Sequence, residues 1–254
     1  MSRFYRLLRK DLEASRWPLV FLSGITVGIM LFVRHRVSTG AWPPTGAIAA
    51  VVIPLTFLPL WLMWQSFQTL RSEWREDTVY TLLVLPVPGW QIMLSKLVSI
   101  WVEYTVLLAV TLGGTLLFFW GMLEDALRTL PSVSWAVSNG LLIYLASLAI
   151  LASFVIFVQL AFVVGKMVGR LQGIVAIWTL VLASWLVDKL GMLFEPLFRW
   201  IPSLPLHRLL RLHELGRDVT LEWNLAPEIG TWLGILALFW ATSYLFEHYV
   251  EVNG

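Results

Sequence analysis

The amino-acid sequence predicts an all-α integral membrane protein with six transmembrane helices. Its 254 residues are 58% hydrophobic and 13% charged, with a mean hydropathy of +0.77. Soluble domains contain about 45–50% apolar and about 25% charged residues, so this chain is too apolar for a soluble globule. The apolar residues form long runs without charge, and the 15 Trp residues suit the interfacial layers of a bilayer. Such runs must be helical, because every backbone N–H and C=O in lipid needs an internal hydrogen-bond partner.

Six stretches are apolar enough and long enough to cross a membrane, which takes about 20 residues of helix. The predicted spans are residues 17–33, 48–68, 98–121, 135–164, 171–190 and 229–248. We expect them to form a single transmembrane domain over residues 1–254. The first span follows basic residues, as in a signal peptide, but it ends at Arg34-His35-Arg36 with no evident small-residue cleavage site after it.

The distribution of Lys and Arg favours a cytoplasmic N-terminus, because these residues concentrate in the cytoplasmic segments of membrane proteins. In that orientation ten of them are cytoplasmic, three lie in short external segments and five lie in the external segment 188–228. Counted over the short segments, ten Lys and Arg residues are cytoplasmic and three are external; counted over the whole chain, ten are cytoplasmic and eight are external. We therefore expect a multi-pass protein of the plasma (cytoplasmic) membrane with both termini in the cytoplasm.

Two segments outside the spans have amphipathic sequences. Ser2–Arg16 has apolar and basic residues at a spacing that fits an interfacial helix on the membrane surface, or it serves only as a basic topology signal. Pro202–Asp218 predicts an external amphipathic helix, although a re-entrant segment fits the same pattern. The external segment 188–228 is too short to form an extracellular domain.

The sequence contains no pattern that predicts catalysis, metal binding or nucleotide binding. His213-Glu214 lacks the second His of the zinc-protease motif, because Arg217 stands at that position. Gly165-Lys166 has no strand before it and does not belong to a phosphate-binding loop. The chain has no Cys, and its net charge of +2 suggests no nucleic-acid partner. We therefore expect no enzyme activity, no catalytic residue, no metal and no cofactor in this chain.

One acid and one pair of glycines stand out within the predicted spans. Glu103 lies about 10 Å along the helix from Lys96, near the inner boundary of the membrane. An acid there serves either a transport pathway or a structural role. Gly24 and Gly28 form a small-xxx-small motif, which lets another helix approach closely either within the subunit or at a dimer interface.

The segment Arg71–Lys96, called the polar island below, is a short polar stretch between the second and third spans. Ser72 can cap a helix whose first turn contains acidic residues, as the helix dipole favours. The Pro86-Val-Pro88-Gly89 stretch then enforces a turn, because each proline fixes its own φ and restricts the residue before it. This order predicts a cytoplasmic helix parallel to the membrane and a rigid elbow, or simply a polar loop.

The polar island resembles the corresponding segment in permease subunits of type-2 ATP-binding-cassette (ABC) exporters. The resemblance rests on a Glu, a Thr, an L-L-x-L-P-V-P run and a Lys near the next span: Glu73, Thr78, Leu82, Leu83, Leu85, Pro86, Val87, Pro88 and Lys96. Six spans, cytoplasmic termini and an N-terminal surface helix are also similar to that family. The resemblance covers the whole chain as architecture, but as a motif it covers only the polar island.

The resemblance implies that the polar island contains a coupling helix that docks on a separate ATPase. The implied ATPase-coupling residues are Glu73, Arg75, Asp77, Thr78, Leu85, Pro86, Pro88 and Lys96, with Lys166 and Arg170 as a secondary cytoplasmic contact. Two copies of the ATPase would bind the ATP and Mg. A second permease, either the same chain or a paralogue, would complete the complex in the lipid membrane, with Gly24 and Gly28 suited to their interface. We expect no nucleotide-binding domain fused to this chain, so that the ATPase is a separate chain.

Two other functions fit the composition less well. A non-transporting membrane assembly or immunity protein would use the same spans without an ATP-driven cycle. An intramembrane hydrolase would need polar catalytic groups that converge at membrane depth, for which His207, His213 and Glu214 are the available candidates. The sequence leaves the transported substrate open, since the many Trp, Leu and Phe residues suit amphipathic cargo and plain lipid contact equally well.

Overall fold

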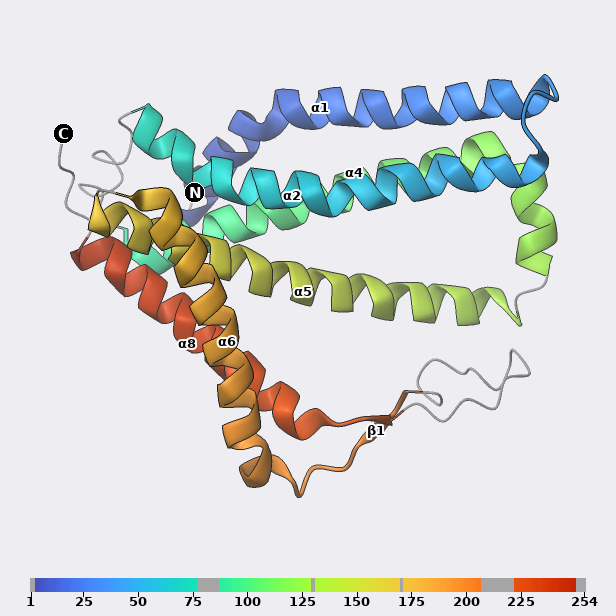
Figure 1. Ribbon diagram of the computed structural model, residues 1–254. Coiled ribbons are helices and arrows are strands. Elements are labelled where there is room, and N and C mark those ends of the chain that lie inside the picture. The colour runs from blue at the N-terminus through green and yellow to red at the C-terminus, as the bar shows by residue number, and fades with distance from the viewer. Residues whose placement is uncertain (1–2, 77–86, 129–130, 170, 207–221, 250–254) are drawn as a thin grey trace. The chain divides into compact units, whose positions relative to one another are not determined.

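The computed structural model describes residues 3–76, 87–128, 131–169, 171–206 and 222–249 (Figure 1). In chain order, the elements are α1 (Arg3–Ser38), the 3-10 helix η1 (Pro44–Ile48), α2 (Ala49–Arg75), α4 (Gly89–Arg128), α5 (Val133–Val168), α6 (Gln172–Phe198), β1 (Leu204–Pro205), β2 (Glu222–Trp223) and α8 (Leu225–His248). Six helices of this described part are long and apolar enough to cross a membrane, which confirms the predicted fold class.

Several of these helices are longer than the predicted spans. Helix α1 contains 36 residues, which gives it a length of about 54 Å against about 30 Å for the hydrocarbon core of a bilayer. The structure shows no break between the predicted surface helix Ser2–Arg16 and the first span, because α1 is a single helix from Arg3 to Ser38. Its first turns are angled relative to the rest (Figure 1), and the helix contains one proline, Pro18.

The described chain divides into two compact units, and the first comprises Met1–Thr69 and Leu94–Thr129. It contains α1, η1, most of α2 and most of α4. Buried Met30 and Val33 of α1 pack in one cluster with Ala50 and Phe119. At Phe119 the backbone leaves helical geometry, with φ −124° and ψ 20°, and the last turns of α4 change direction there (Figure 1).

The second unit comprises Leu70–Met93 and Leu130–Gly254, with α5, α6 and α8 as its long helices. Ser132 caps α5 by accepting a hydrogen bond from Trp135 N at 3.1 Å, and Asn224 caps α8 in the same way. Helices α6 and α8 pack closely (Figure 1), because a Cβ on Gly191 would lie 2.5 Å from Thr231 Oγ1 and one on Gly230 would lie 3.0 Å from Gly191 Cα.

A two-residue antiparallel pairing joins β1 and β2, with Leu204 opposite Trp223 and Pro205 opposite Glu222. This pairing lies within the segment predicted to be external, 188–228, into which α6 also extends as far as Phe198. Most of Pro202–Asp218, including His207, His213 and Glu214, lies outside the described residues, so the choice between an interfacial helix and a re-entrant segment stays a prediction.

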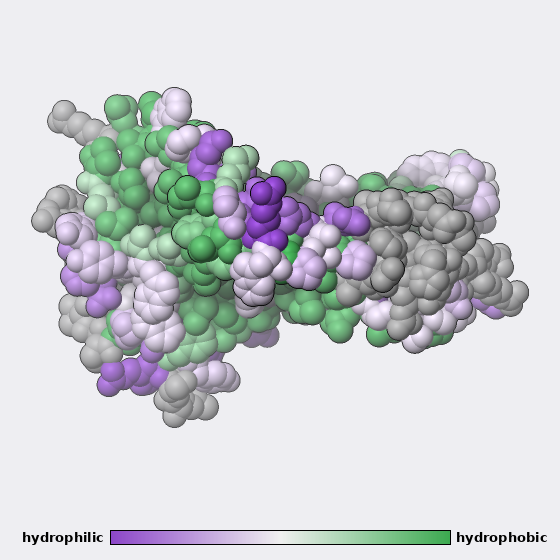
Figure 2. Space-filling model, turned by 90° about the horizontal axis from the view of Figure 1, so that it is seen from below, coloured by the Kyte–Doolittle hydropathy of each residue, from purple (hydrophilic) through white to green (hydrophobic). Residues whose placement is uncertain are grey.

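Large hydrophobic side chains are exposed along the long helices of both units. Examples are Trp17 and Leu117 in the first unit and Ile143, Trp178 and Trp240 in the second. Hydrophobic residues also cover much of the face shown in Figure 2. Surfaces this apolar are expected where helices contact lipid, whereas soluble monomers rarely expose large contiguous apolar patches.

Candidate functional site

The first flank of the polar island is the last turn of α2, which is anchored within the second unit by Trp74. The Trp74 ring packs edge-on against Phe162 of α5 at 5.0 Å and Phe246 of α8 at 6.0 Å between ring centroids. Lys166 Nζ lies 5.8 Å from the centroid of the Trp74 ring, within the range of a cation–π interaction. The structure therefore brings Lys166, predicted to be a secondary contact, to the polar island.

The prediction that Ser72 caps a new helix is wrong. Helix α2 continues without interruption to Arg75, and Glu76 N donates a hydrogen bond to Ser72 O at 2.9 Å. No proline or glycine interrupts this turn, and the contacts of Trp74 hold it against α5 and α8. Ser72 is therefore a residue of the last turns of α2 rather than its boundary.

The second flank of the polar island is the start of α4, which is held by α8 and α5. Gly89 N donates a hydrogen bond to Glu247 Oε2 at 3.1 Å, so an acid lies at the N-terminal end of a helix, where the helix dipole favours it. A Cβ at Gly89 would lie 2.7 Å from Ser243 O, and only glycine allows this approach. One turn further on, the buried Gln159 side chain of α5 donates to Met93 O at 3.1 Å.

The predicted ATPase-coupling residues occupy different environments. Arg75 and Pro88 are exposed, whereas Glu73 and Lys96 are only 4% and 2% exposed and so are not presented to a partner in this conformation. Asp77, Thr78, Leu85, Pro86 and the secondary contact Arg170 lie outside the described residues.

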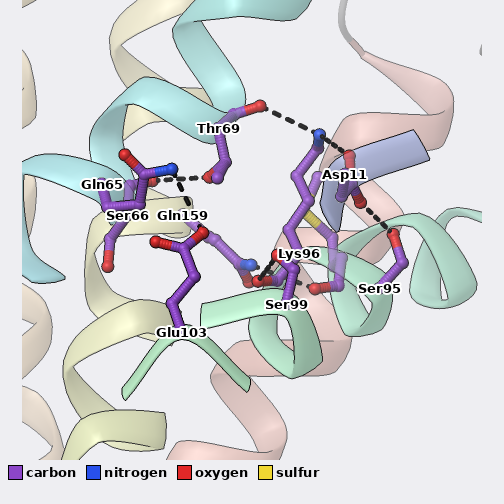
Figure 3. Close-up of polar contacts among 10 residues, drawn as sticks. Asp11, Gln65, Ser66, Thr69, Ser95, Lys96, Ser99, Glu103 and Gln159 are labelled. Carbon is purple, nitrogen blue, oxygen red and sulfur yellow. Dashed lines mark hydrogen bonds and ion pairs between the residues drawn. The ribbon is translucent and has the colours of Figure 1, made fainter. Parts of the chain in front are cut away.

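Lys96 instead belongs to a buried polar cluster in the first unit, at the junction of α1, α2 and α4 (Figure 3). Its Nζ lies 3.3 Å from Asp11 Oδ1 and donates to Thr69 O at 2.9 Å. Ser95 Oγ donates to the other carboxylate oxygen, Asp11 Oδ2, at 2.8 Å. A buried ion pair persists only when additional hydrogen bonds satisfy its charges, and these contacts supply them.

Glu103 extends this cluster along α4. It is completely buried, and its Oε1 accepts a hydrogen bond from Gln65 Nε2 of α2 at 3.2 Å (Figure 3). Ser15 and Trp61 also lie within electrostatic reach of its carboxyl group. Even so, Glu103 Oε2 and Trp61 Nε1 are both buried without a hydrogen-bond partner among the described residues. Glu103 is therefore an acid inside the helix packing rather than one that reaches water.

An apolar cavity of about 360 Å³ lies between the same three helices of the first unit. Phe21 and Thr26 of α1, Ile53 and Trp61 of α2, and Leu107 of α4 are among its lining residues. By contrast, a Cβ at Gly24 or Gly28 of α1 would meet nothing within 4 Å. These glycines therefore mediate no close helix contact among the described residues.

Sequence reasoning missed several residues of these sites. Gln65 and Gln159 were detectable, because each is a polar side chain inside a predicted apolar span. Asp11, Trp74 and Glu247 gave no such signal, since acids and tryptophans are ordinary residues near membrane boundaries. Among the described residues, no group of three or more His, Asp or Glu side chains is placed to hold a metal ion.

Together these features define a multi-pass α-helical membrane protein with polar groups buried between its helices. Residues 14–176, more than half of the chain, match the model of a family described as ABC-2 family transporter protein. The chain therefore belongs to this family, and it is a permease component of an ABC transporter, as the polar island predicted. Members of such a family work with an ABC ATPase subunit. Neither the curated proteins nor the solved structures contain a significant match to the chain.

Proposed function

We propose that this chain is the permease of an ABC exporter, that it forms the translocation path, and that a separate ATPase drives it through the polar island. Two ATPase copies bind the ATP and Mg, and this chain hydrolyses none. A second permease, identical or paralogous, completes the complex in the plasma membrane, with both termini of this chain cytoplasmic. The anchoring of both flanks of the polar island on α5 and α8 carries the proposal.

A force on the polar island has two routes into the helices. Trp74 and Gly89 transmit it to α5 and α8 by direct contact, through Phe162, Phe246 and Glu247. In addition, residues 70–75 of α2 and residues 89–93 of α4 belong to the second unit, whereas the rest of α2 and of α4 belongs to the first. A movement of the polar island therefore also travels along the backbones of α2 and α4.

The first test replaces the anchor of the polar island. Trp74→Ala removes the aromatic and cation–π contacts at the end of α2, so we expect the reconstituted complex to keep ATP hydrolysis but lose at least about tenfold in transport per ATP. The measurement is ATPase activity and transport in proteoliposomes that contain the co-purified ATPase. Trp178→Ala is the matched control, since Trp178 is exposed on α6.

The outcome separates the exporter from the other functions. Failure to recover any ATPase with the chain, together with full function of Trp74→Ala and Glu73→Ala, would contradict the proposal. A non-transporting assembly or immunity protein predicts ATP hydrolysis that is independent of the permease. A hydrolase predicts activity in the purified chain alone, and loss of that activity on alanine substitution of His213 or Glu214.

A further inference from the structure

The cavity of the first unit and the buried acid Glu103 lie about one helical turn apart along α2 and α4. Trp61 and Leu107 line the cavity, on α2 and α4 respectively. Gln65 is one helical turn beyond Trp61, and Glu103 is one turn before Leu107, so the hydrogen-bonded Gln65–Glu103 pair lies next to the Trp61 end of the cavity. The electrostatic interaction between Trp61 and Glu103 is consistent with this placement.

The charges at this end of the cavity do not balance. The buried charged side chains of the first unit, within the part that the structure describes, are Asp11, Lys96 and Glu103. Asp11 and Lys96 form an ion pair with each other. The carboxyl group of Glu103 interacts with the neutral side chains of Gln65, Ser15 and Trp61 and with the like charge of Asp11, and its Oε2 makes no hydrogen bond among the described residues. None of these groups supplies a positive charge. An ionised Glu103 therefore leaves one uncompensated negative charge behind Trp61.

We propose that this cavity binds an amphipathic monocation, a compact apolar molecule that carries one positive charge. The apolar lining takes the body of the ligand, and the cation lies against the Trp61 ring with the Glu103 carboxylate about one helical turn, roughly 5 Å, behind it. The negative face of an indole attracts cations, and the attraction to a buried carboxylate is only weakly screened in a low-dielectric site.

The size of the cavity favours a free small molecule over a bilayer lipid. Its volume of about 360 Å³ lies near the lower limit of pockets that bind small molecules, roughly 300–1,000 Å³. A phospholipid with two acyl chains is several times larger and would leave most of its volume outside. The lining also provides few hydrogen-bonding groups for a polar or anionic ligand, since most of its residues are apolar.

Binding of tritiated tetraphenylphosphonium to the purified chain in phosphatidylcholine nanodiscs, without ATPase or nucleotide, tests this inference independently of the proposed function. We expect saturable binding that unlabelled tetraphenylphosphonium displaces and that tetraphenylborate, an anion of nearly the same shape, does not. Glu103→Gln should weaken binding roughly tenfold or more, because it removes the charge and keeps the shape. Glu13→Gln, an exposed acid on α1, should leave binding unchanged.

Two further variants test the cavity itself and keep the inference testable if Glu103→Gln does not fold. Ile53→Trp fills the cavity and should abolish binding, whereas Trp61→Leu keeps an apolar lining and should weaken binding of the cation. Equal displacement by tetraphenylborate, unchanged binding in Glu103→Gln or Ile53→Trp, or no saturable binding at all would overturn the inference. Displacement by phosphatidylethanolamine added to the nanodiscs would also overturn it, in favour of a lipid headgroup.

Discussion

Two ion pairs that involve residues of α1 show how burial decides what an ion pair contributes to stability. The Asp11–Lys96 pair is only 8% and 2% exposed, whereas the Arg9–Glu13 pair, with a shorter N–O distance of 2.7 Å, is 62–65% exposed. Water and salt screen the exposed pair, which therefore contributes little to stability. The buried pair cannot lose one partner without leaving a charge that water does not solvate.

Replacing Lys96 with Met should therefore destabilise the first unit by about 3–5 kcal/mol, because it leaves Asp11 buried and unpaired. Glu13→Gln should change the stability by about 1 kcal/mol or less. Thermal unfolding of the detergent-solubilised chain measures both. The double variant Asp11→Leu with Lys96→Met should recover much of the stability lost in Lys96→Met, because it leaves no buried charge. If Lys96→Met, Glu13→Gln and the double variant were equally destabilised, this account would be contradicted.

At the scale of helices, close contacts depend on where glycine occurs. Gly191 of α6 faces Gly230 of α8, and a Cβ on either would come within 3.0 Å of atoms on the opposite helix. In contrast, a Cβ on Gly173, near the start of α6, would meet nothing within 4 Å. The same residue type is therefore required at one position of α6 and replaceable at another.

Gly230→Ala should lower the stability of the α6–α8 pair by about 1–3 kcal/mol, because the added methyl group forces two packed helices apart. Gly173→Ala should be neutral or slightly stabilising, since alanine is favoured over glycine by about 1 kcal/mol in a helix. Urea unfolding of the solubilised chain compares the two variants. A Gly230→Ala protein as stable as Gly173→Ala would show that α6 and α8 do not approach this closely.

The helices were predictable from the sequence, but their contacts were not. An apolar run such as that of α5 identifies a membrane helix by its own composition. In lipid, the backbone N–H and C=O of every residue need an internal hydrogen-bond partner, which a helix provides. The position of Trp74 or Glu247 depends instead on which helix lies opposite, and residues far apart in the chain decide that. Ser72 illustrates the failure, since its capping propensity was overridden by the continuous helix around it.

At the scale of the whole molecule, one exposed face of α1 is suited to contact the proposed second permease. Gly24 and Gly28 are exposed on α1, one turn apart on the same face, and neither lies close to another described side chain. A small-xxx-small pair lets two helices approach closely when a partner is present. Since nothing within the described chain occupies this face, we expect it to contact the second permease.

Gly24→Leu combined with Gly28→Leu should therefore dissociate the permease pair without unfolding the chain, because both side chains would enter open space. Light scattering of the complex in nanodiscs or mild detergent would show a shift from dimer to monomer, and thermal unfolding would show little change. Gly140→Leu, at an equally open position on α5, is the matched control. If the double variant stays dimeric while its transport and ATP hydrolysis are normal, the interface lies elsewhere on the molecule. The glycines would then have no role in pairing the permeases.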